Sequence, residues 1–329
     1  MEDVARQAGV SLGTVSNVLN KPHMVSEKTR EKVREAIQQL GFVPDRRARA
    51  LAAGTSKTIG FVVIDLSNSF FLDMARGAEQ EAQTAGFNVL LADSDMQVEK
   101  ERVYMELFDE ERVAGILLAP LPSPADDVVT SGRWGRDVVV LNSPVAEDRC
   151  SVIVDDEVGG YRAARHLIER GRRRLVFAGG PDTLAPVRNR RRGVERAVAE
   201  TNGAVGLSFL KSSELQAPDG RKLGHRLAAM AAGERPDGIV AAADLLALGM
   251  IQAVLAETEL RFPEDLSLIG YDDNRAAWDS VVPITTMAQP GTEMGRVGAR
   301  LLIEEIRSGR THRHEHVVLE PTLLVRESS

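Results

Sequence analysis

The sequence predicts a small all-α unit at the N-terminus, followed by two larger α/β lobes. The first 41 residues contain short segments in which apolar residues recur at helical spacing, with no strand-like run among them. From Thr58 onward, apolar, β-branched runs such as IGFVVIDL, NVLLAD and DVVVLN alternate with amphipathic stretches. Runs that are apolar throughout indicate parallel strands with helices on both faces of the sheet. Because these runs are too many for one ordinary doubly wound sheet, we expect two lobes with a ligand cleft at the carboxyl ends of their strands.

Three helices are expected in the N-terminal unit, at residues 2–8, 12–19 and 26–40. Gly9 suits the tight turn after the first helix, because glycine tolerates a positive φ. Ser11 is a good N-cap for the second helix, since its hydroxyl can accept a hydrogen bond from a backbone N–H of the first turn. Ala5 is small enough to lie where the first two helices cross. The pattern is therefore that of a helix-turn-helix.

The second helix divides into an inward and an outward face. The residues expected to point inward and fix the helix are Val10, Val15 and Val18. The residues left outward, free to enter a DNA groove, are Leu12, Gly13, Thr14, Ser16 and Asn17. The alternative is a helical hairpin that serves only packing, with a solvated outer face.

The charge distribution favours DNA binding. The chain has 329 residues and a formal net charge of −7. Residues 1–57 contain ten basic and six acidic side chains, a net +4 that leaves −11 for the remainder. A basic excess confined to one small unit indicates phosphate contact at that unit.

Composition also limits the compartment. Apolar residues never run long enough for a membrane span, and the N-terminus has no apolar signal segment. The single cysteine, Cys150, permits no internal disulfide and no cysteine-based metal cluster. We therefore expect a cytoplasmic, nucleoid-associated protein with no membrane partner.

Long stretches of the chain resemble a known family. The segment DVARQAGVSLGTVSNVLN, followed by VSEKTREKVREAIQQLGFVPDRRARAL, is similar to the headpiece of the lactose-repressor/galactose-repressor family of bacterial transcription regulators. The resemblance continues in TIGFVVIDLSNSFF, GGYRAARHLIERG, SLIGYDDN and VVLEPTLLVRESS, and so covers nearly the whole chain.

The resemblance implies three parts. They are a helix-turn-helix headpiece at 1–43, a hinge helix and linker at 44–57, and an effector-binding and dimerisation domain at 58–329. The last part would form two Rossmann-like lobes of the periplasmic-binding-protein type. The first lobe would take residues 58–156 and 289–316, and the second would take 157–288 and 317–329.

The resemblance also assigns residues that would contact DNA. Leu12, Gly13 and Asn17 match positions that read base edges in the major groove, whereas Thr14 and Ser16 match positions that mainly contact phosphates. In the hinge helix, Leu51 matches the leucine that wedges between central base pairs from the minor groove. Arg46 and Arg49 would lie beside phosphates or the groove edge. The alternative for Leu51 is a lone apolar residue on a linker.

In the cleft, the residues that the resemblance implies for effector binding are Asn68, Phe70, Phe71, Asn142, Arg190, Asp244, Asp272 and Gln289. Three positions depart from the family pattern, namely Asn142-Ser143, Ala243-Asp244 and Leu215. They remove usual polar or stacking partners of a sugar, which favours an effector that is smaller or less hydroxylated, or none at all. The alternative for the retained residues is a structural bridge between the lobes.

His312, His314 and His316 follow one another at every second position, so in a strand they would share a face and could chelate zinc. A solvated connector before the strand VVLE is the simpler interpretation, and Cys150 suits a small half-buried hydrophobe. We expect neither a metal nor a cofactor.

The sequence contains no nucleotide-binding G-x-G-x-x-G after a strand, no G-x-S-x-G elbow and no HExxH, so we do not expect an enzyme. We expect a repressor that binds a palindromic operator as a homodimer, through an interface on the helices that follow the first strands. A small-molecule effector, such as a sugar or a related metabolite, would switch it. The alternative is a solute-binding protein of the same lobe architecture, which would need an export signal.

Overall fold

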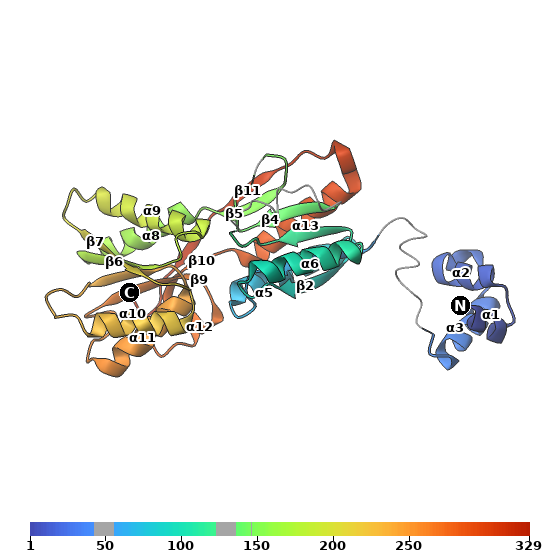
Figure 1. Ribbon diagram of the computed structural model, residues 1–329, viewed down its shortest axis with the longest axis horizontal. Coiled ribbons are helices and arrows are strands. Elements are labelled where there is room, and N and C mark those ends of the chain that lie inside the picture. The colour runs from blue at the N-terminus through green and yellow to red at the C-terminus, as the bar shows by residue number, and fades with distance from the viewer. Residues whose placement is uncertain (43–55, 123–135, 146) are drawn as a thin grey trace. The chain divides into compact units, whose positions relative to one another are not determined.

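The computed structural model describes residues 1–329 except 43–55, 123–135, 146 and the side chain of Arg310 (Figure 1). The chain divides into two compact units, Met1–Ser56 and Lys57–Ser329.

The described part of the first unit is helical, as predicted. Its helices are α1 (Glu2–Ala8), α2 (Leu12–Asn20), a 3-10 turn (Pro22–Met24) and α3 (Glu27–Gln39). Their apolar faces form one small core of Val4, Ala5, Val15, Val18, Val33 and Ala36. Gly9 has the positive φ of 64° that the turn requires, and the Ser11 hydroxyl accepts a hydrogen bond from the Thr14 N–H at 3.1 Å. Because that bond caps α2, the start of the helix is fixed at the predicted residue.

The second unit contains two six-stranded sheets, which confirms the predicted pair of α/β lobes. The first sheet has the order β11-β5-β4-β3-β1-β2, and its paired strands are parallel. Its strands are β1 (Thr58–Val63), β2 (Asn88–Asp93), β3 (Gly115–Leu118), β4 (Asp137–Leu141), β5 (Ser151–Val154) and β11 (His316–Leu319). The helices of this lobe are α5 (Ser69–Thr84), α6 (Val98–Glu110) and α13 (Gly291–Ser308), and a 3-10 turn (Gly309–Thr311) follows α13.

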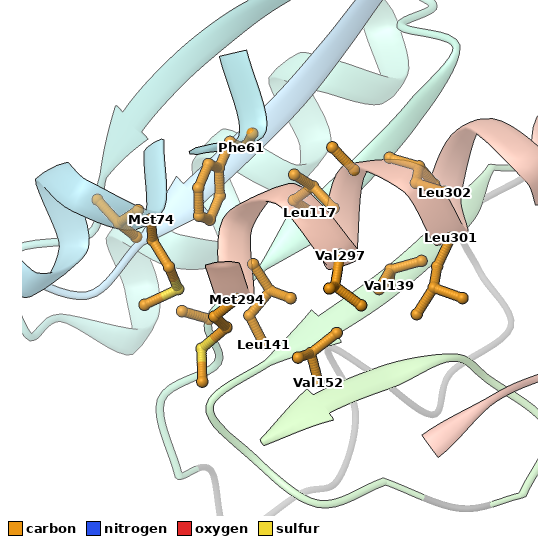
Figure 2. Close-up of a cluster of buried hydrophobic side chains, with 14 of the residues drawn as sticks. Phe61, Met74, Leu117, Val139, Leu141, Val152, Met294, Val297, Leu301 and Leu302 are labelled. Carbon is orange, nitrogen blue, oxygen red and sulfur yellow. The ribbon is translucent and has the colours of Figure 1, made fainter. Parts of the chain in front are cut away.

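The core of the first lobe lies where α5 and α13 cover one face of this sheet. Figure 2 shows Met74 of α5 and Met294 and Val297 of α13 beside Leu117 and Leu141 of the strands. The two helices touch backbone to backbone. Glycine is required at that contact, because a Cβ on residue 77 would collide with the carbonyl oxygen of residue 292.

The second sheet has the order β12-β10-β9-β8-β6-β7, with only β12 antiparallel to its neighbour among the described pairs. Its strands are β6 (Arg174–Gly179), β7 (Gly206–Lys211), β8 (Gly238–Ala241), β9 (Ser267–Asp272), β10 (Thr285–Ala288) and β12 (Thr322–Leu324). Its helices are α8 (Asp156–Glu169), α9 (Ala185–Ala199), α10 (Ala217–Ala228), α11 (Asp244–Glu257) and α12 (Arg275–Trp278).

The chain passes between the sheets after β5, after β10 and after β11. Residues 317–319 form part of β11 and so belong to the first sheet, whereas the sequence analysis placed them in the second lobe. The reason is that β11 continues its pairing with β5 as far as Leu319 opposite Val154. Parallel strands bring their carboxyl ends to one edge of each sheet, and the polar residues that follow them meet there.

Candidate DNA-binding surface and ligand cleft

The outward face of α2 is the candidate DNA-binding surface. Val15 is fully buried and Val18 is 8% exposed, whereas Leu12 is 47% exposed. Gly13 and Asn17 are also exposed, and Thr14 and Ser16 are half-buried. All five residues that the family resemblance assigns to DNA on this helix therefore lie away from the core of the unit.

The polar side chains of α2 differ in whether they already make hydrogen bonds within the protein. The Thr14 hydroxyl lies 2.9 Å from the Ser11 hydroxyl, and Ser16 Oγ accepts a hydrogen bond from Asn20 Nδ2 at 3.3 Å. The Asn17 carboxamide makes no side-chain hydrogen bond with the described residues. An unengaged carboxamide on an exposed helical face can form the bidentate pair with adenine that base reading requires.

The three residues assigned to the hinge helix, Arg46, Arg49 and Leu51, lie outside the described residues. Their roles, and the hinge helix itself, stay predictions.

The ligand cleft of the second unit has a volume of about 590 Å³ and lies at the carboxyl ends of the strands. The predicted effector residues that line it are Asn68, Phe70, Phe71, Asn142, Arg190, Asp272 and Gln289. Most of the remaining wall is apolar. It consists of leucines and prolines from both lobes and of Met96 from the first lobe.

Asn68 links the two lobes. It caps α5 by accepting a hydrogen bond from the Phe70 N–H at 3.0 Å. Its amide nitrogen donates to Asp272 Oδ2 at 2.9 Å, and its carbonyl oxygen accepts from Asn274 Nδ2 at 2.9 Å. Because Asp272 and Asn274 belong to the second lobe, this one carboxamide joins the two lobes across the cleft.

Arg190 is the centre of a buried charge cluster on the second lobe. Its guanidinium donates to Asp156 Oδ1 at 2.8 Å and to the Ala242 carbonyl at 2.6 Å, and it lies 3.7 Å from Asp272 Oδ1. Its carbon Cζ also lies 3.6 Å from the centre of the Tyr271 ring. We call Asp156, Arg190 and Asp272 the Arg190 cluster. With a side chain only 4% exposed, Arg190 is occupied by protein partners and has little surface left for a ligand.

The Arg190 cluster depends on close helix packing. A Cβ on Gly160 of α8 would collide with the backbone carbonyl of Arg190 on α9, so the glycine lets the two helices approach. Burial raises the pKa of both Asp156 and Asp272, and the Arg190 cation opposes that rise. Gln289 Nε2 donates a further hydrogen bond to Asp272 Oδ1 at 2.6 Å.

Asp244 does not line the cleft, which corrects the sequence analysis. It is fully buried at the start of α11, and its Oδ2 accepts a hydrogen bond from the Asn274 N–H at 2.7 Å. Burial, with the nearby Asp272, raises the pKa of Asp244 well above its usual range. Asp244 therefore holds the loop that presents Asn274 to Asn68, rather than contacting a ligand. The adjacent Leu245 is the residue that reaches the wall.

The two phenylalanines are also more structural than expected. Phe70 is 3% exposed and Phe71 is 6% exposed, and both belong to the core of the first lobe. Only a small part of either ring is therefore open to the cleft.

Sequence reasoning missed a second link between the lobes. Gln216 Nε2 donates to Asp65 Oδ2 at 2.5 Å, and both residues line the cleft. Asp65 lies two residues after the end of β1. A polar residue at the carboxyl end of a buried parallel strand is expected to reach the cleft, so this position could have been predicted from the sequence. Gln216 lies in a loop before α10, where no sequence pattern marks it.

None of the helices in the described parts of the chain combines the length and apolar composition needed to cross a membrane.

Comparisons with known proteins match both units of the chain. The model of the bacterial regulatory proteins, lacI family, matches residues 1–45, and that of the periplasmic binding protein-like domain matches residues 164–329. The HTH-type transcriptional repressor PurR of Vibrio cholerae serotype O1 (strain M66-2) is 32% identical over 100% of this chain and 97% of its own. The HTH-type transcriptional regulator RegA of Clostridium saccharobutylicum is 33% identical over 100% of this chain and 98% of its own.

This chain belongs to the lacI family of bacterial regulatory proteins. Solved structures of similar proteins extend the match. The lac repressor dimer bound to operator and the anti-inducer ONPF has 25% identity and a TM-score of 0.83, covering 99% of this chain and 97% of that one. The complex of the transcriptional regulator CelR with cellobiose has 30% identity and a TM-score of 0.74, covering 100% and 99%. As a family member with both parts, the chain is a DNA-binding transcriptional regulator and not a solute-binding protein.

Proposed function

We propose that the chain represses transcription by binding an inverted-repeat operator as a homodimer, with α2 of each copy in a major groove and Asn17 reading a base. The observation that supports this is the exposed face of α2, on which Asn17 has an unengaged carboxamide. One such helix reads only a short half-site, so two copies related by a two-fold axis gain both affinity and specificity. The lac repressor of known structure binds its operator as a dimer.

A dimer interface is proposed on the first lobe. Four large apolar side chains on neighbouring elements β2 and α6 are exposed, namely Leu90, Leu91, Val103 and Leu107. Leu90 lies opposite Gly60, which packs against α6, so it shares a side of the sheet with the α6 residues, whereas Leu91 points to the other side. Exposed apolar side chains near one another are typical of an interface between proteins. This agrees with the interface expected on the helices after the first strands.

The chemistry of the cleft limits the effector. Two buried acceptor atoms of lining residues, Asn142 Oδ1 and Gln289 Oε1, have no hydrogen-bond donor among the described residues. A buried acceptor without a donor costs free energy, which a hydroxyl or amino group of a ligand would recover. The mostly apolar wall suits a compact compound with an apolar face. We therefore propose an effector that combines an apolar face with hydrogen-bond donors, rather than one that is hydroxylated all round.

Switching would act through the links between the lobes. Asn68, Ser69 and Asp73 of the first lobe contact residues 272–275 of the second lobe. A ligand that binds one arrangement of the lobes more tightly than the other shifts the balance between them. A coupling of about 1–3 kcal/mol between cleft and operator is typical of such regulators.

The DNA-reading role is tested by selecting bound sequences from random duplexes with the full-length chain. We expect an inverted repeat. The variant Asn17→Ala should lose its base preference at one symmetric pair of operator positions. The binding free energy that separates the preferred base from the others at these positions should fall by about 1–3 kcal/mol. The control is Gln38→Ala, which removes an exposed carboxamide from α3 of the same unit. An unchanged base preference in Asn17→Ala would contradict the assigned role.

The effector site is tested with Asn142→Gly. Asn142 has a positive φ of 61°, so glycine keeps the backbone whereas alanine would strain it. We expect weaker effector binding with unchanged operator affinity. Ser143→Ala, at the adjacent lining position, is the matched control. An effector affinity that is equal in the wild type and in Asn142→Gly would place the ligand elsewhere.

A further inference from the structure

Outside the cleft, the structure brings together four side chains with metal-binding atoms, Cys150, Glu305, His312 and His314. We call them the thiol–imidazole cluster. Cys150 directly precedes β5, and the two histidines lie in the segment before β11. Because β5 and β11 are parallel neighbours with Ser151 opposite His316, the residues before both strands lie side by side. Glu305 comes from the last turns of α13. No member of the cluster lines the cleft.

The separations between the ligand atoms suit one small metal ion. Cys150 Sγ lies 3.1 Å from His312 Nε2 and 3.8 Å from His314 Nδ1, and His314 Nδ1 lies 3.7 Å from Glu305 Oε1. The ligand atoms of all four residues lie within 4.8 Å of one another. Zinc bonds of about 2.0–2.3 Å at tetrahedral angles put neighbouring ligand atoms about 3.3–3.6 Å apart. Because the separations reach 4.8 Å, side-chain movements of about 1 Å would complete the coordination shell.

The donor set also fits zinc by charge and chemistry. Thiolate and imidazole ligands select transition metals of the zinc class over magnesium or calcium. One thiolate and one carboxylate together neutralise a divalent cation, while the two imidazoles bind as neutral groups. The Glu315 N–H donates to Cys150 Sγ at 3.3 Å, which is the kind of outer contact that orients a metal-bound thiolate.

The surroundings of Glu305 also favour a cation. Glu305 Oε2 is buried without a hydrogen-bond partner among the described residues, and no described lysine or arginine forms an ion pair with this carboxylate. A bound divalent cation would supply the missing positive charge.

We propose that Cys150, Glu305, His312 and His314 form a binding site for one divalent metal ion of the zinc class. The ion would join the end of α13 to the starts of β5 and β11, which pair at the border of the first sheet. It would therefore stabilise this side of the first lobe. The site is independent of the proposed operator and effector roles.

The neighbouring His316 supplies a matched control. It lies two residues after His314, but its Nδ1 makes a hydrogen bond with Ser151 Oγ at 2.9 Å and it does not belong to the cluster. The variant His314→Ala removes a ligand at an exposed position, so its folding should be preserved. Cys150→Ala removes the thiolate itself.

The test is a titration of the metal-free, full-length chain with Co²⁺. We expect one ion per chain, with a thiolate-to-cobalt charge-transfer band and the visible absorption of a tetrahedral site. Cys150→Ala should lose the charge-transfer band, and His316→Ala should keep it. Zn²⁺ affinity, measured by competition with a chromophoric chelator, should fall at least about 10-fold in His314→Ala, because even changes to residues behind metal ligands cost 10–100-fold.

Two results would overturn the proposal. One is a cobalt spectrum without the thiolate band in wild-type protein. The other is an equal Zn²⁺ affinity for the wild type and His314→Ala when circular dichroism shows both to be folded.

Discussion

The Arg190 cluster and the thiol–imidazole cluster both bury acidic groups in the second unit, but they differ in the positive charge that lies beside those groups. In the Arg190 cluster, Asp156 and Asp272 lie beside a guanidinium supplied by the chain itself. In the thiol–imidazole cluster, the carboxylate of Glu305 has a histidine as its ion-pair neighbour and no described lysine or arginine. The first arrangement is complete without a ligand, and the second is completed by a cation. The Arg190 cluster shows that charged residues at a cleft can have a structural role. The thiol–imidazole cluster shows that a binding site can lie where the only signal in the sequence is the spacing of its histidines.

The largest effect should come from removing the cation of the complete cluster. Arg190→Met leaves Asp156 and Asp272 buried without their partner, and such a loss costs about 3–5 kcal/mol of folding free energy. The measurement is chemical denaturation of the full chain, followed through the unfolding of the second unit. The control is Arg191→Met on the same helix, whose ion pair with Glu195 is partly exposed and is worth at most about 1 kcal/mol. Equal losses for the two variants would show that Arg190 is not the electrostatic centre of its cluster.

A smaller effect is expected at Glu101, a buried carboxylate beside which the described residues place neither an arginine nor other metal-binding side chains. Glu101 is fully buried, and its Oε2 accepts a hydrogen bond from the Leu121 N–H at 2.7 Å. Burial raises its pKa from 4.5 to about 7, against the effect of that hydrogen bond. The folded state therefore prefers the protonated form.

Since the pKa of Glu101 is higher in the folded than in the unfolded chain, its contribution to stability is fully present below pH 4.5 and is lost as the pH rises through about 7. Between pH 4.5 and 8, the unfolding free energy of the wild type should fall on the order of 2 kcal/mol relative to that of Glu101→Gln. The unfolding free energy of both proteins, measured across this range, provides the test. Glu106→Gln, at an exposed position of the same helix, should follow the wild type. A wild type that gains stability relative to Glu101→Gln over this range would contradict the assignment.

The smallest effect concerns the charged link at the mouth of the cleft. Arg275 forms an ion pair with Asp73 across the lobes at 2.6 Å, but both side chains are about one-third exposed. Arg275→Ala should therefore ease opening of the lobes by at most about 1 kcal/mol. Hydrogen exchange of the Arg275 backbone N–H, which donates to Ser69 Oγ at 3.0 Å in the wild type, should accelerate by up to about 5-fold.

The matched control for this link is Arg76→Ala, because Arg76 contacts Asp73 only within α5. Unchanged exchange in Arg275→Ala would mean that the hydrogen bonds of Asn68 and Gln216 hold the lobes together without this ion pair.

Local patterns predicted the described helices of the first unit almost residue by residue. Ser11, Gly9 and the valines of α2 act within one or two helical turns, so their spacing contains the needed information. In the second unit, buried parallel strands were visible as apolar runs. Strand β7 was missed because its exposed, alternating residues lie at a sheet border, and β10 and β12 were missed because they are short.

The cleft and the thiol–imidazole cluster could be predicted from the sequence only in part. Residues after parallel strands reach the cleft because the sheet topology requires it, and this is why Asn68, Asn142 and Asp272 line it. Asp244 was misplaced because it begins a helix one residue behind the wall. The histidine pair was visible in the sequence, but Cys150 lies more than 160 residues away, and only the pairing of β5 with β11 brings them together.

The central claim, that two copies read DNA through α2, is tested most directly by comparing a selected inverted repeat with the same duplex after one half is scrambled. The account predicts two chains on the intact repeat and, on the scrambled duplex, an affinity at least about 100-fold weaker, because the second copy loses its specific contacts. A single chain bound with equal affinity to both duplexes would contradict it.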